Sequence, residues 1–287
     1  MNTKHIQIPT PALTVLNFSG GQQSSAILWM ILRGELVPPK PFIVLNADPG
    51  MENSETYQYV KRMQRLCEDA KILFVTVPGP NLYLDLLQAK SLGKTRLDFP
   101  PYWTKDKETG KRGRLRQKCT SAYKIAPMDR ELRRELRRLY GISLIGRMPS
   151  KIKVVKYIGF SVDEQHRVSE SKQDYIKFEY PLIDLGMTKA DVIAYFERIG
   201  EKSPARSVCN ACFANSVSHF REMKKDRPQD FAQAVAIDLE VRDLSQFGVR
   251  ETVFVCSACI PLAELDAAEN SGLEEEEYSC DSGYCFV

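Results

Sequence analysis

The N-terminal part of the chain contains the segment Leu13-Thr-Val-Leu-Asn-Phe-Ser19-Gly20-Gly21-Gln22-Gln23-Ser24-Ser25. Its first six residues form an apolar run typical of a buried strand, and the apolar positions from Ala26 to Arg33 follow a helical spacing. Between strand and helix, the two glycines would let backbone N–H groups at the helix N-terminus approach an anion closely. The P-loop of kinases and GTPases differs, because it needs a lysine where this chain has Gln22. The segment therefore predicts a strand–turn–helix unit that binds the phosphates of a nucleotide.

Strands and helices alternate through the rest of the first half of the chain. Apolar runs predict further strands at 42–46, 72–77 and 154–160, and helices are expected from about Ser54 and over about 127–140. This order predicts a parallel sheet with right-handed crossovers. Because sites in such sheets lie at the carboxyl ends of the strands, we expect the loops after three strands to converge on one crevice. These loops are 19–25, 48–52 and 161–167.

The length and composition fit one large α/β domain with an appendage. The chain has 287 residues, of which 43% are hydrophobic and 27% charged, so wholesale disorder is excluded. We expect a doubly wound, mainly parallel sheet that binds the nucleotide in residues 1–185, and a smaller Cys-containing helical region in 186–287 that completes the site. No apolar run approaches the roughly 18–20 residues of a membrane span, and the N-terminus lacks the apolar stretch of a signal peptide. We therefore expect a soluble, cytoplasmic protein.

Charge is distributed unevenly along the chain. Residues 105–138 contain 13 Lys and Arg against 5 Asp and Glu, whereas residues 261–287 contain 8 acidic residues and no Lys or Arg. The basic block indicates either a polyanionic partner, such as nucleic acid or nucleotide phosphates, or a solvated helix face. If nucleic acid binds, Lys111, Arg112, Arg114 and Arg116 are the residues expected to contact its backbone.

Eight cysteines are many for an intracellular chain, and most of them occur in pairs. In a reducing compartment such pairs indicate metal, cluster or redox chemistry rather than disulfides. The pairs are Cys209 with Cys212, Cys256 with Cys259, and Cys280 with Cys285. Cys256 and Cys259 lie in an apolar run, so we expect them to be core residues, as we do Cys67.

The turn 19–25 resembles the PP-loop of the adenine-nucleotide alpha-hydrolase superfamily, the ATP pyrophosphatases, and most of all the phosphoadenosine phosphosulfate (PAPS) reductase-like branch. Further segments resemble that branch in the expected order. They are Asn46-Ala-Asp48-Pro-Gly-Met-Glu52, Lys118-Cys119-Thr-Ser-Ala-Tyr-Lys124, Ile158-Gly159-Phe-Ser161-Val-Asp163-Glu164 with Arg167, Ser207-Val-Cys209-Asn-Ala-Cys212-Phe213, and the tail Cys280–Cys285. Two features depart from the pattern: Gln23 stands where many ATP-cleaving members have Asp, and Phe213 follows Cys212 without an intervening Pro.

The resemblance implies an enzyme that cleaves ATP between the α and β phosphates, adenylates an acceptor and lets a sulfur nucleophile displace AMP, with nucleic-acid thiolation as one outcome. It assigns nucleotide binding to Ser19, Gly20, Gly21, Gln22, Gln23, Ser24, Ser25, Gly159, Ser161 and Arg167. Asp48 and Glu52 would help to hold Mg²⁺, which prefers oxygen ligands, or would form a turn and helix N-cap pair. Gln23 leaves both ATP and PAPS open as the nucleotide.

Catalytic roles fall on Cys119, Lys124, Asp163 and Glu164 in this interpretation. Lys118, Lys124 or Arg167 would neutralise phosphate charge in the transition state, and Asp163 or Glu164 would orient a metal or the acceptor. We expect Lys118 and Lys124 to favour the thiolate form of Cys119. His166 is either a general base or an exposed loop residue.

Cys119, Cys209 and Cys212, with Cys285 or Cys280 as a fourth ligand, form the predicted metal-binding set. Three thiolates would hold a 4Fe-4S cluster with one iron open, and a fourth would close it. Zinc and a metal-free redox or persulfide pair remain alternatives. Tyr102 and Trp103 would either stack on a base or pack within a loop.

Two other functions stay open. One is a thiol-dependent PAPS or APS reductase, and the other is a non-catalytic subunit that binds nucleotide and nucleic acid. The partners expected from the resemblance and the charge pattern are an adenine nucleotide, nucleic acid (tRNA or DNA) at the 105–138 block, a sulfur-donor protein and a second copy of the chain. We expect no membrane partner.

Overall fold

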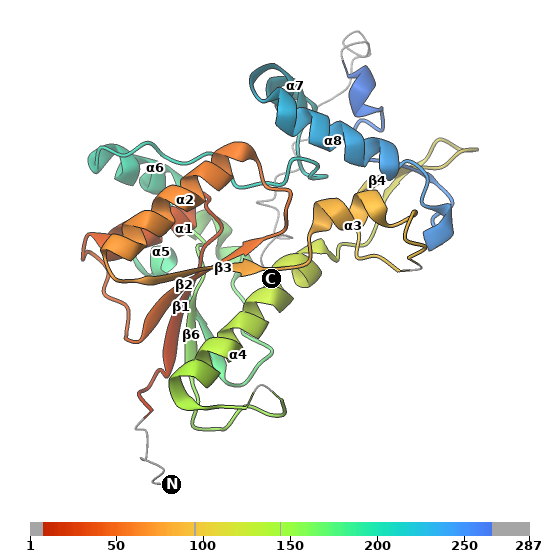
Figure 1. Ribbon diagram of the computed structural model, residues 1–287. Coiled ribbons are helices and arrows are strands. Elements are labelled where there is room, and N and C mark those ends of the chain that lie inside the picture. The colour runs from red at the N-terminus through yellow and green to blue at the C-terminus, as the bar shows by residue number, and fades with distance from the viewer. Residues whose placement is uncertain (1–7, 95, 144, 266–287) are drawn as a thin grey trace.

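Five parallel strands form the main sheet of the structure, a computed structural model of the chain (Figure 1). The structure describes residues 8–94, 96–143 and 145–265, so the predicted ligands Cys280 and Cys285 lie outside the described residues. The strands are β1 (Leu13–Asn17), β2 (Phe42–Asp48), β3 (Leu73–Pro78), β6 (Val154–Tyr157) and β7 (Ile176–Glu179), in the order β3-β2-β1-β6-β7. Every neighbouring pair is parallel. The predicted α/β fold with a doubly wound, parallel sheet is confirmed.

Helices cover both faces of this sheet (Figure 1). On one face, α1 (Gln22–Leu32), α2 (Ser54–Asp69), α5 (Pro181–Asp184) and α6 (Lys189–Arg198) pack against Leu16 and Val44. On the other face, α4 (Ala126–Tyr140) packs against Val15, Ile43 and Leu45. Successive strand residues point to opposite faces, so an apolar run such as 13–18 buries both sides of its strand.

The helix boundaries follow local side-chain chemistry. Asn53 begins α2 by accepting a hydrogen bond from the backbone N–H of Thr56 at 2.7 Å. A π-helical turn, Ser121–Ile125, leads directly into α4, which ends at Gly141 in the left-handed conformation with φ of 68°. The predicted helices from about Ser54 and over about 127–140 are therefore confirmed.

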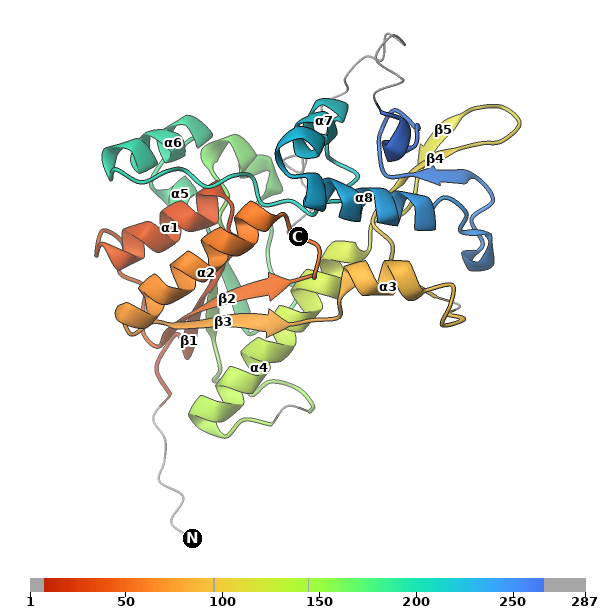
Figure 2. The same cartoon turned by 45° about the horizontal axis from the view of Figure 1, so that its top comes forward.

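A second lobe surrounds a three-stranded antiparallel sheet in the order β5-β4-β8 (Figure 2). Its strands are β4 (Trp103–Lys105), β5 (Arg112–Arg114) and β8 (Thr252–Phe254), and its helices are α3 (Leu82–Gln88), α7 (Val217–Asp226) and α8 (Pro228–Glu240). Short 3-10 turns occur in this lobe at Ser245–Phe247 and Leu262–Glu264, and a further one, Val162–Arg167, follows β6 of the main sheet. The α3 helix and the β4–β5 hairpin both lie within residues 78–118, between β3 and the Cys119 segment.

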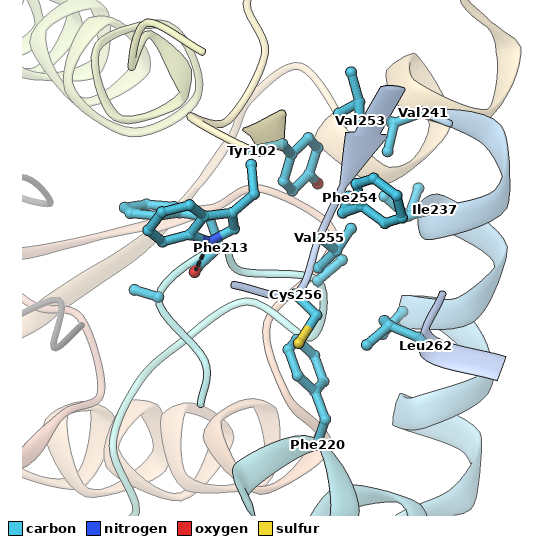
Figure 3. Packing of buried hydrophobic residues seen from close by; sticks show 14 of the residues in the cluster. Tyr102, Phe213, Phe220, Ile237, Val241, Val253, Phe254, Val255, Cys256 and Leu262 are labelled. Carbon is cyan, nitrogen blue, oxygen red and sulfur yellow. Dashed lines mark hydrogen bonds between the residues drawn. The ribbon is translucent and has the colours of Figure 1, made fainter. Parts of the chain in front are cut away.

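The core of the second lobe contains two residues for which the sequence left a choice of roles. Tyr102 is fully buried and Trp103 is 8% exposed, and the Trp103 indole N–H donates to the carbonyl of Phe213 at 3.0 Å (Figure 3). Both rings therefore pack inside the protein, and the base-stacking alternative was wrong. Cys256 points towards Phe220 in the same core, and Cys259 is also buried, as expected.

The hydrophobic clusters draw residues from distant parts of the chain. Val192 and Phe196 of α6 belong to the cluster beneath α1 and α2, while Leu82 and Tyr102 belong to the cluster of α7 and α8. Cys67 is fully buried in the first of these clusters, which confirms its predicted core position. No helix in the described part of the chain combines the length and apolarity of a membrane span.

Candidate functional site

The main sheet has a topological switch point between β1 and β6. The chain runs outward from β1 to β2 and β3 on one side, then returns to β6 and β7 on the other. Ligands in open parallel sheets bind where the strand order reverses, at the carboxyl ends of the strands. A cavity of about 170 Å³, which we call the switch-point cavity, lies at this place. Its lining includes Asn17, Ser19, Gly21, Gln22, Gln23, Ser24, Gly159, Phe160, Glu164, Arg167, Lys189, Arg206 and Ser207.

Hydrogen bonds within the turn after β1 fix its shape. Gly20 has a φ of +80°, and the Ser19 hydroxyl accepts from the Gly21 backbone N–H at 3.2 Å and lies 3.1 Å from the Ser24 hydroxyl. Gly159 packs directly against this turn, because a Cβ atom there would lie 2.8 Å from the backbone nitrogen of Ser24. The turn that begins α1 therefore depends on Gly159, which follows β6, as well as on Gly20 and Gly21 within the turn itself.

A buried ion pair forms one wall of the switch-point cavity. Arg167 pairs with Glu164, and both side chains are 4% exposed. Glu164 also accepts from the Gln23 side-chain amide at 2.9 Å, and the Arg167 guanidinium lies 4.2 Å from the centre of the Phe160 ring. Nε and Nη2 of Arg167 have no hydrogen-bond partner among the described residues. Buried donors of this kind are normally satisfied, so their position beside the cavity fits an acceptor-rich ligand.

Several predicted nucleotide-site residues lie outside this lining. Ser25 and Ser161 are fully buried, and Gly20 faces Val60 and Thr56 of α2. Asp163 is exposed and accepts from the backbone N–H of Lys189 at 2.6 Å, a contact that holds its pKa below the usual range. Asp163 therefore sits at the start of α6.

The acidic turn after β2 faces a second cavity of about 240 Å³, which we call the acidic-turn cavity. Ser19, Asp48 and Glu52 all line it. Asp48 accepts from the backbone N–H of Gly50 at 2.7 Å and from the Tyr57 hydroxyl at 2.7 Å, and burial together with that contact raises the pKa of Tyr57. Asp48 therefore stabilises the turn after β2, which was one of the two roles predicted for it. The N-cap of α2 is Asn53 and not Glu52.

Three cysteines from two distant segments line a third cavity, the cysteine cavity, of about 40 Å³. Its lining includes Cys119, Cys209, Cys212, Lys124, Thr120, Ser207 and Phe213. An isolated antiparallel bridge between Glu52 and Cys209 joins the acidic turn to the cysteine segment. Glu52 accepts from the ammonium of Lys124 at 2.7 Å and from the Ser207 hydroxyl at 3.3 Å, and the Cys209 sulfur lies 3.9 Å from it.

Burial controls the charge of these thiols. It raises the pKa of Cys212 to about 11 and raises the pKa of Cys119 and of Cys209 although Lys124 opposes the shift. The expected effect of Lys124 on Cys119 is present, because its charge lowers the pKa of the thiol, but burial outweighs it. Lys118 is exposed and lies 3.6 Å from Asp98.

The donor set of this cavity consists of soft ligands. Thiolates bind both zinc and iron–sulfur clusters, so the chemistry of Cys119, Cys209 and Cys212 fits either group. In the described part of the chain, no group of three or more His, Cys, Asp or Glu side chains is already placed to hold one metal ion.

One segment separates the switch-point cavity from the cysteine cavity. Ser207 lines both, and Ile125 of the first is next in sequence to Lys124 of the second. Sequence reasoning missed Lys189, Arg206 and the shared position of Ser207. Lys189 and Arg206 have no motif around them, and only the fold brings them to the carboxyl end of β1.

Comparisons with known proteins give distant structural likenesses. No family model and no curated protein matches the chain. Among solved structures, the chain is similar to the U34-tRNA thiolase NcsA from Methanococcus maripaludis with its 4Fe-4S cluster, with a TM-score of 0.39 and 13% sequence identity. The alignment covers 92% of this chain and 83% of that one. This likeness assigns no activity and no residue role to the present chain.

Proposed function

We propose that the protein is a PP-loop enzyme that adenylates an acceptor, with nucleic acid as the acceptor class, and transfers sulfur to it. The observation that carries this proposal is the position of Ser207 in the wall of two cavities, one suited to a nucleotide and the other lined by three cysteines. An enzyme that activates an acceptor and then delivers sulfur needs both sites next to one reacting atom.

The switch-point cavity has the donors that an adenine nucleotide requires. The backbone of Gly21 at the N-terminus of α1 and the hydroxyls of Ser19 and Ser24 line it, and all of them suit phosphate oxygens. Lys189, Arg206 and the unsatisfied donors of Arg167 add positive charge and hydrogen bonds around the same space. These groups would stabilise the charge that develops when the α–β phosphate bond breaks.

The proposed reaction has two balanced steps. An acceptor oxygen attacks the α-phosphorus of ATP, the α–β P–O bond breaks, and pyrophosphate leaves with the electron pair. A sulfur nucleophile at the oxidation level of sulfide then replaces the adenylated oxygen, and AMP leaves. Both steps are substitutions without net oxidation, so the co-reactants are ATP and a sulfide-level donor.

Cys119, Cys209 and Cys212 would hold a 4Fe-4S cluster in the cysteine cavity. When bound, a cluster with three protein thiolates supplies an iron with an open position for a sulfur ligand. These thiols would lose their protons on metal binding, because the ligand is the thiolate. Lys124 would offset part of the resulting negative charge, and its pair with Glu52 keeps the cation in place.

A thiol-dependent PAPS reductase is the main competing activity. It requires a cysteine that attacks as a thiolate. Burial raises the pKa of Cys119, Cys209 and Cys212, which disfavours that form, and Cys280 and Cys285 lie outside the described residues. The two activities differ in their products. Incubation with α-labelled ATP and single-stranded RNA or DNA should transfer labelled AMP to the acceptor and release pyrophosphate. Sulfite release from PAPS with added thiols, and no transfer from ATP, would replace this proposal by the reductase.

A further inference from the structure

A basic groove lies on the opposite side of the Cys119 segment from the cysteine cavity. Its volume is about 1000 Å³, and it opens between the start of α4 and two parts of the second lobe, α3 and the turn Ser245–Phe247. Five cationic side chains, Lys94, Arg96, Arg116, Lys118 and Arg130, line it. They lie outside the linings of the switch-point, acidic-turn and cysteine cavities.

Ion pairs within the groove neutralise two of the five cations. Lys94 lies 2.5 Å from Asp85, which also accepts from the Tyr123 hydroxyl at 2.9 Å, and Lys118 lies 3.6 Å from Asp98. These two carboxylates are the acidic residues of the lining.

The other three cations are guanidinium groups open to solvent. Arg96, Arg116 and Arg130 are exposed and make no ion pair or hydrogen bond within the described residues. The groove therefore has an excess of three guanidinium groups, which suits a chain of phosphates rather than a single carboxylate.

The wall between the basic groove and the cysteine cavity is formed by neighbouring residues of two segments. Phe99 and Lys118 line the groove, while the residues that follow them, Pro100 and Cys119, line the cysteine cavity. The same alternation recurs where the segment reaches α4, since Tyr123 lines the groove and Lys124 the cavity. A ligand bound in the groove would therefore be separated from the cysteine cavity by a wall one residue thick.

Aromatic rings lie at the same wall. Phe99 and Phe247 are half-buried in the groove lining, and their centres are 5.1 Å apart in an edge-to-face arrangement. A base that is free of a duplex can pack on such rings while its phosphates contact arginine. Enzymes that modify a base need it out of the stack, which favours a single strand over a duplex.

We propose that the basic groove binds a single-stranded segment of nucleic acid, with its phosphates on Arg96, Arg116 and Arg130 and a base against Phe99 and Phe247. This inference rests on the proposed function for the identity of the acceptor. Strand binding can nevertheless be measured without nucleotide, cluster or turnover, so the two proposals can fail separately.

The test is fluorescence anisotropy of the full chain with labelled single-stranded RNA, single-stranded DNA of the same sequence, and the corresponding duplex. The groove variant is R96Q/R116Q/R130Q. The control, R33Q/R62Q/R198Q, removes the same charge from arginines that pair with Glu35 and Glu201 on the α1, α2 and α6 side of the sheet. The logarithmic salt slope should fall by about 2 in the groove variant, since each phosphate contact contributes about 0.7, and affinity at 0.1 M salt should fall at least about tenfold.

The three nucleic-acid probes and the two variants give results that either support or overturn the inference. Tighter binding of RNA or of DNA identifies the acceptor type, and either result supports the groove. Tighter binding of the duplex, equal losses in the two variants, or no strand binding by the parent protein would overturn the inference. If the groove variant loses strand binding but the parent transfers no AMP from ATP, the groove stands and the proposed reaction fails.

Discussion

The ammonium of Lys124 lies 2.7 Å from a carboxylate oxygen of Glu52, and this buried ion pair joins the acidic turn after β2 to the π-helical turn that carries the cysteine site into α4. The side chains are 17% and 6% exposed. Burial alone would lower the pKa of Lys124, but the charge of Glu52 helps to raise it overall, so the cation persists beside the thiols. The pair therefore provides a fixed positive charge where thiolate ligands would collect.

Removal of one partner should be costly. We expect Lys124→Met to lower the free energy of unfolding by about 3 kcal/mol, because it leaves the Glu52 carboxylate buried without its cation. The double variant E52Q/K124M should recover much of that loss. Urea denaturation of the metal-free protein measures both. Equal destabilisation by the single and double variants would show that the ion pair is unimportant.

A side chain at Gly21 should block the nucleotide without damaging the fold. A Cβ atom there would lie 3.4 Å from the Ser19 hydroxyl oxygen and 3.5 Å from Cβ of Ser207, which are ordinary contacts. We expect Gly21→Val to fill the mouth of the switch-point cavity and lower ATP and PAPS affinity at least about tenfold by calorimetry.

Gly159→Ala provides the contrast, since its Cβ would lie 2.8 Å from the Ser24 backbone nitrogen. It should lower both the melting temperature and nucleotide affinity. Unchanged affinity in Gly21→Val would remove the phosphate assignment of this turn.

The guanidinium of Arg167 has several N–H donors, so a lysine at this position should not replace it in nucleotide binding. Lysine at this position keeps a charge for Glu164 but cannot direct two further N–H groups into the cavity. We expect Arg167→Lys to weaken nucleotide binding about tenfold while the melting temperature changes little. Calorimetry and thermal unfolding measure the two effects. Parental affinity in this variant would show that Arg167 only supports the loop.

His219 should make stability depend on pH. Burial, followed by the nearby charge of Arg227, lowers the pKa of this histidine in the folded state. The unfolded chain then binds more protons just below the ordinary value of about 6.5, so stability should fall as pH drops through that region. We expect His219→Gln to flatten this part of the profile in urea denaturation. An unchanged profile in His219→Gln would show that another group controls this pH dependence.

Much of the main sheet could be predicted from the sequence because its strands are buried on both faces. The run 13–18 shows this signal directly, and Cys67 follows from the same apolar logic. The strands β4, β5 and β8 have three residues each, too few for an alternating pattern to be visible. Their pairing depends on contacts between distant segments, such as Trp103 with Phe254.

Site residues that belong to a local sequence motif could be predicted, whereas those that only the packing of distant segments brings together could not. The turn at Gly20 and Gly21 and the pair Cys209 and Cys212 stand out in the sequence. The contact of Gln23 with Glu164 joins residues 141 positions apart, and no local pattern announces it. The thiol of Cys119 shows the same limit, because two nearby lysines in the sequence suggested a thiolate and three-dimensional burial reverses that effect.

The metal content of anaerobically purified protein tests the cysteine site most directly. We expect iron and sulfide near four atoms each per chain with visible absorption, since three thiolates of one cavity would hold a 4Fe-4S cluster. Cys119→Ser, Cys209→Ser and Cys212→Ser should each lose that iron together with ATP-dependent sulfur transfer, whereas the core variants Cys67→Ser and Cys256→Ser should keep it. Stoichiometric zinc without iron, no metal at all, or full iron retention in the three cavity variants would contradict the cluster assignment.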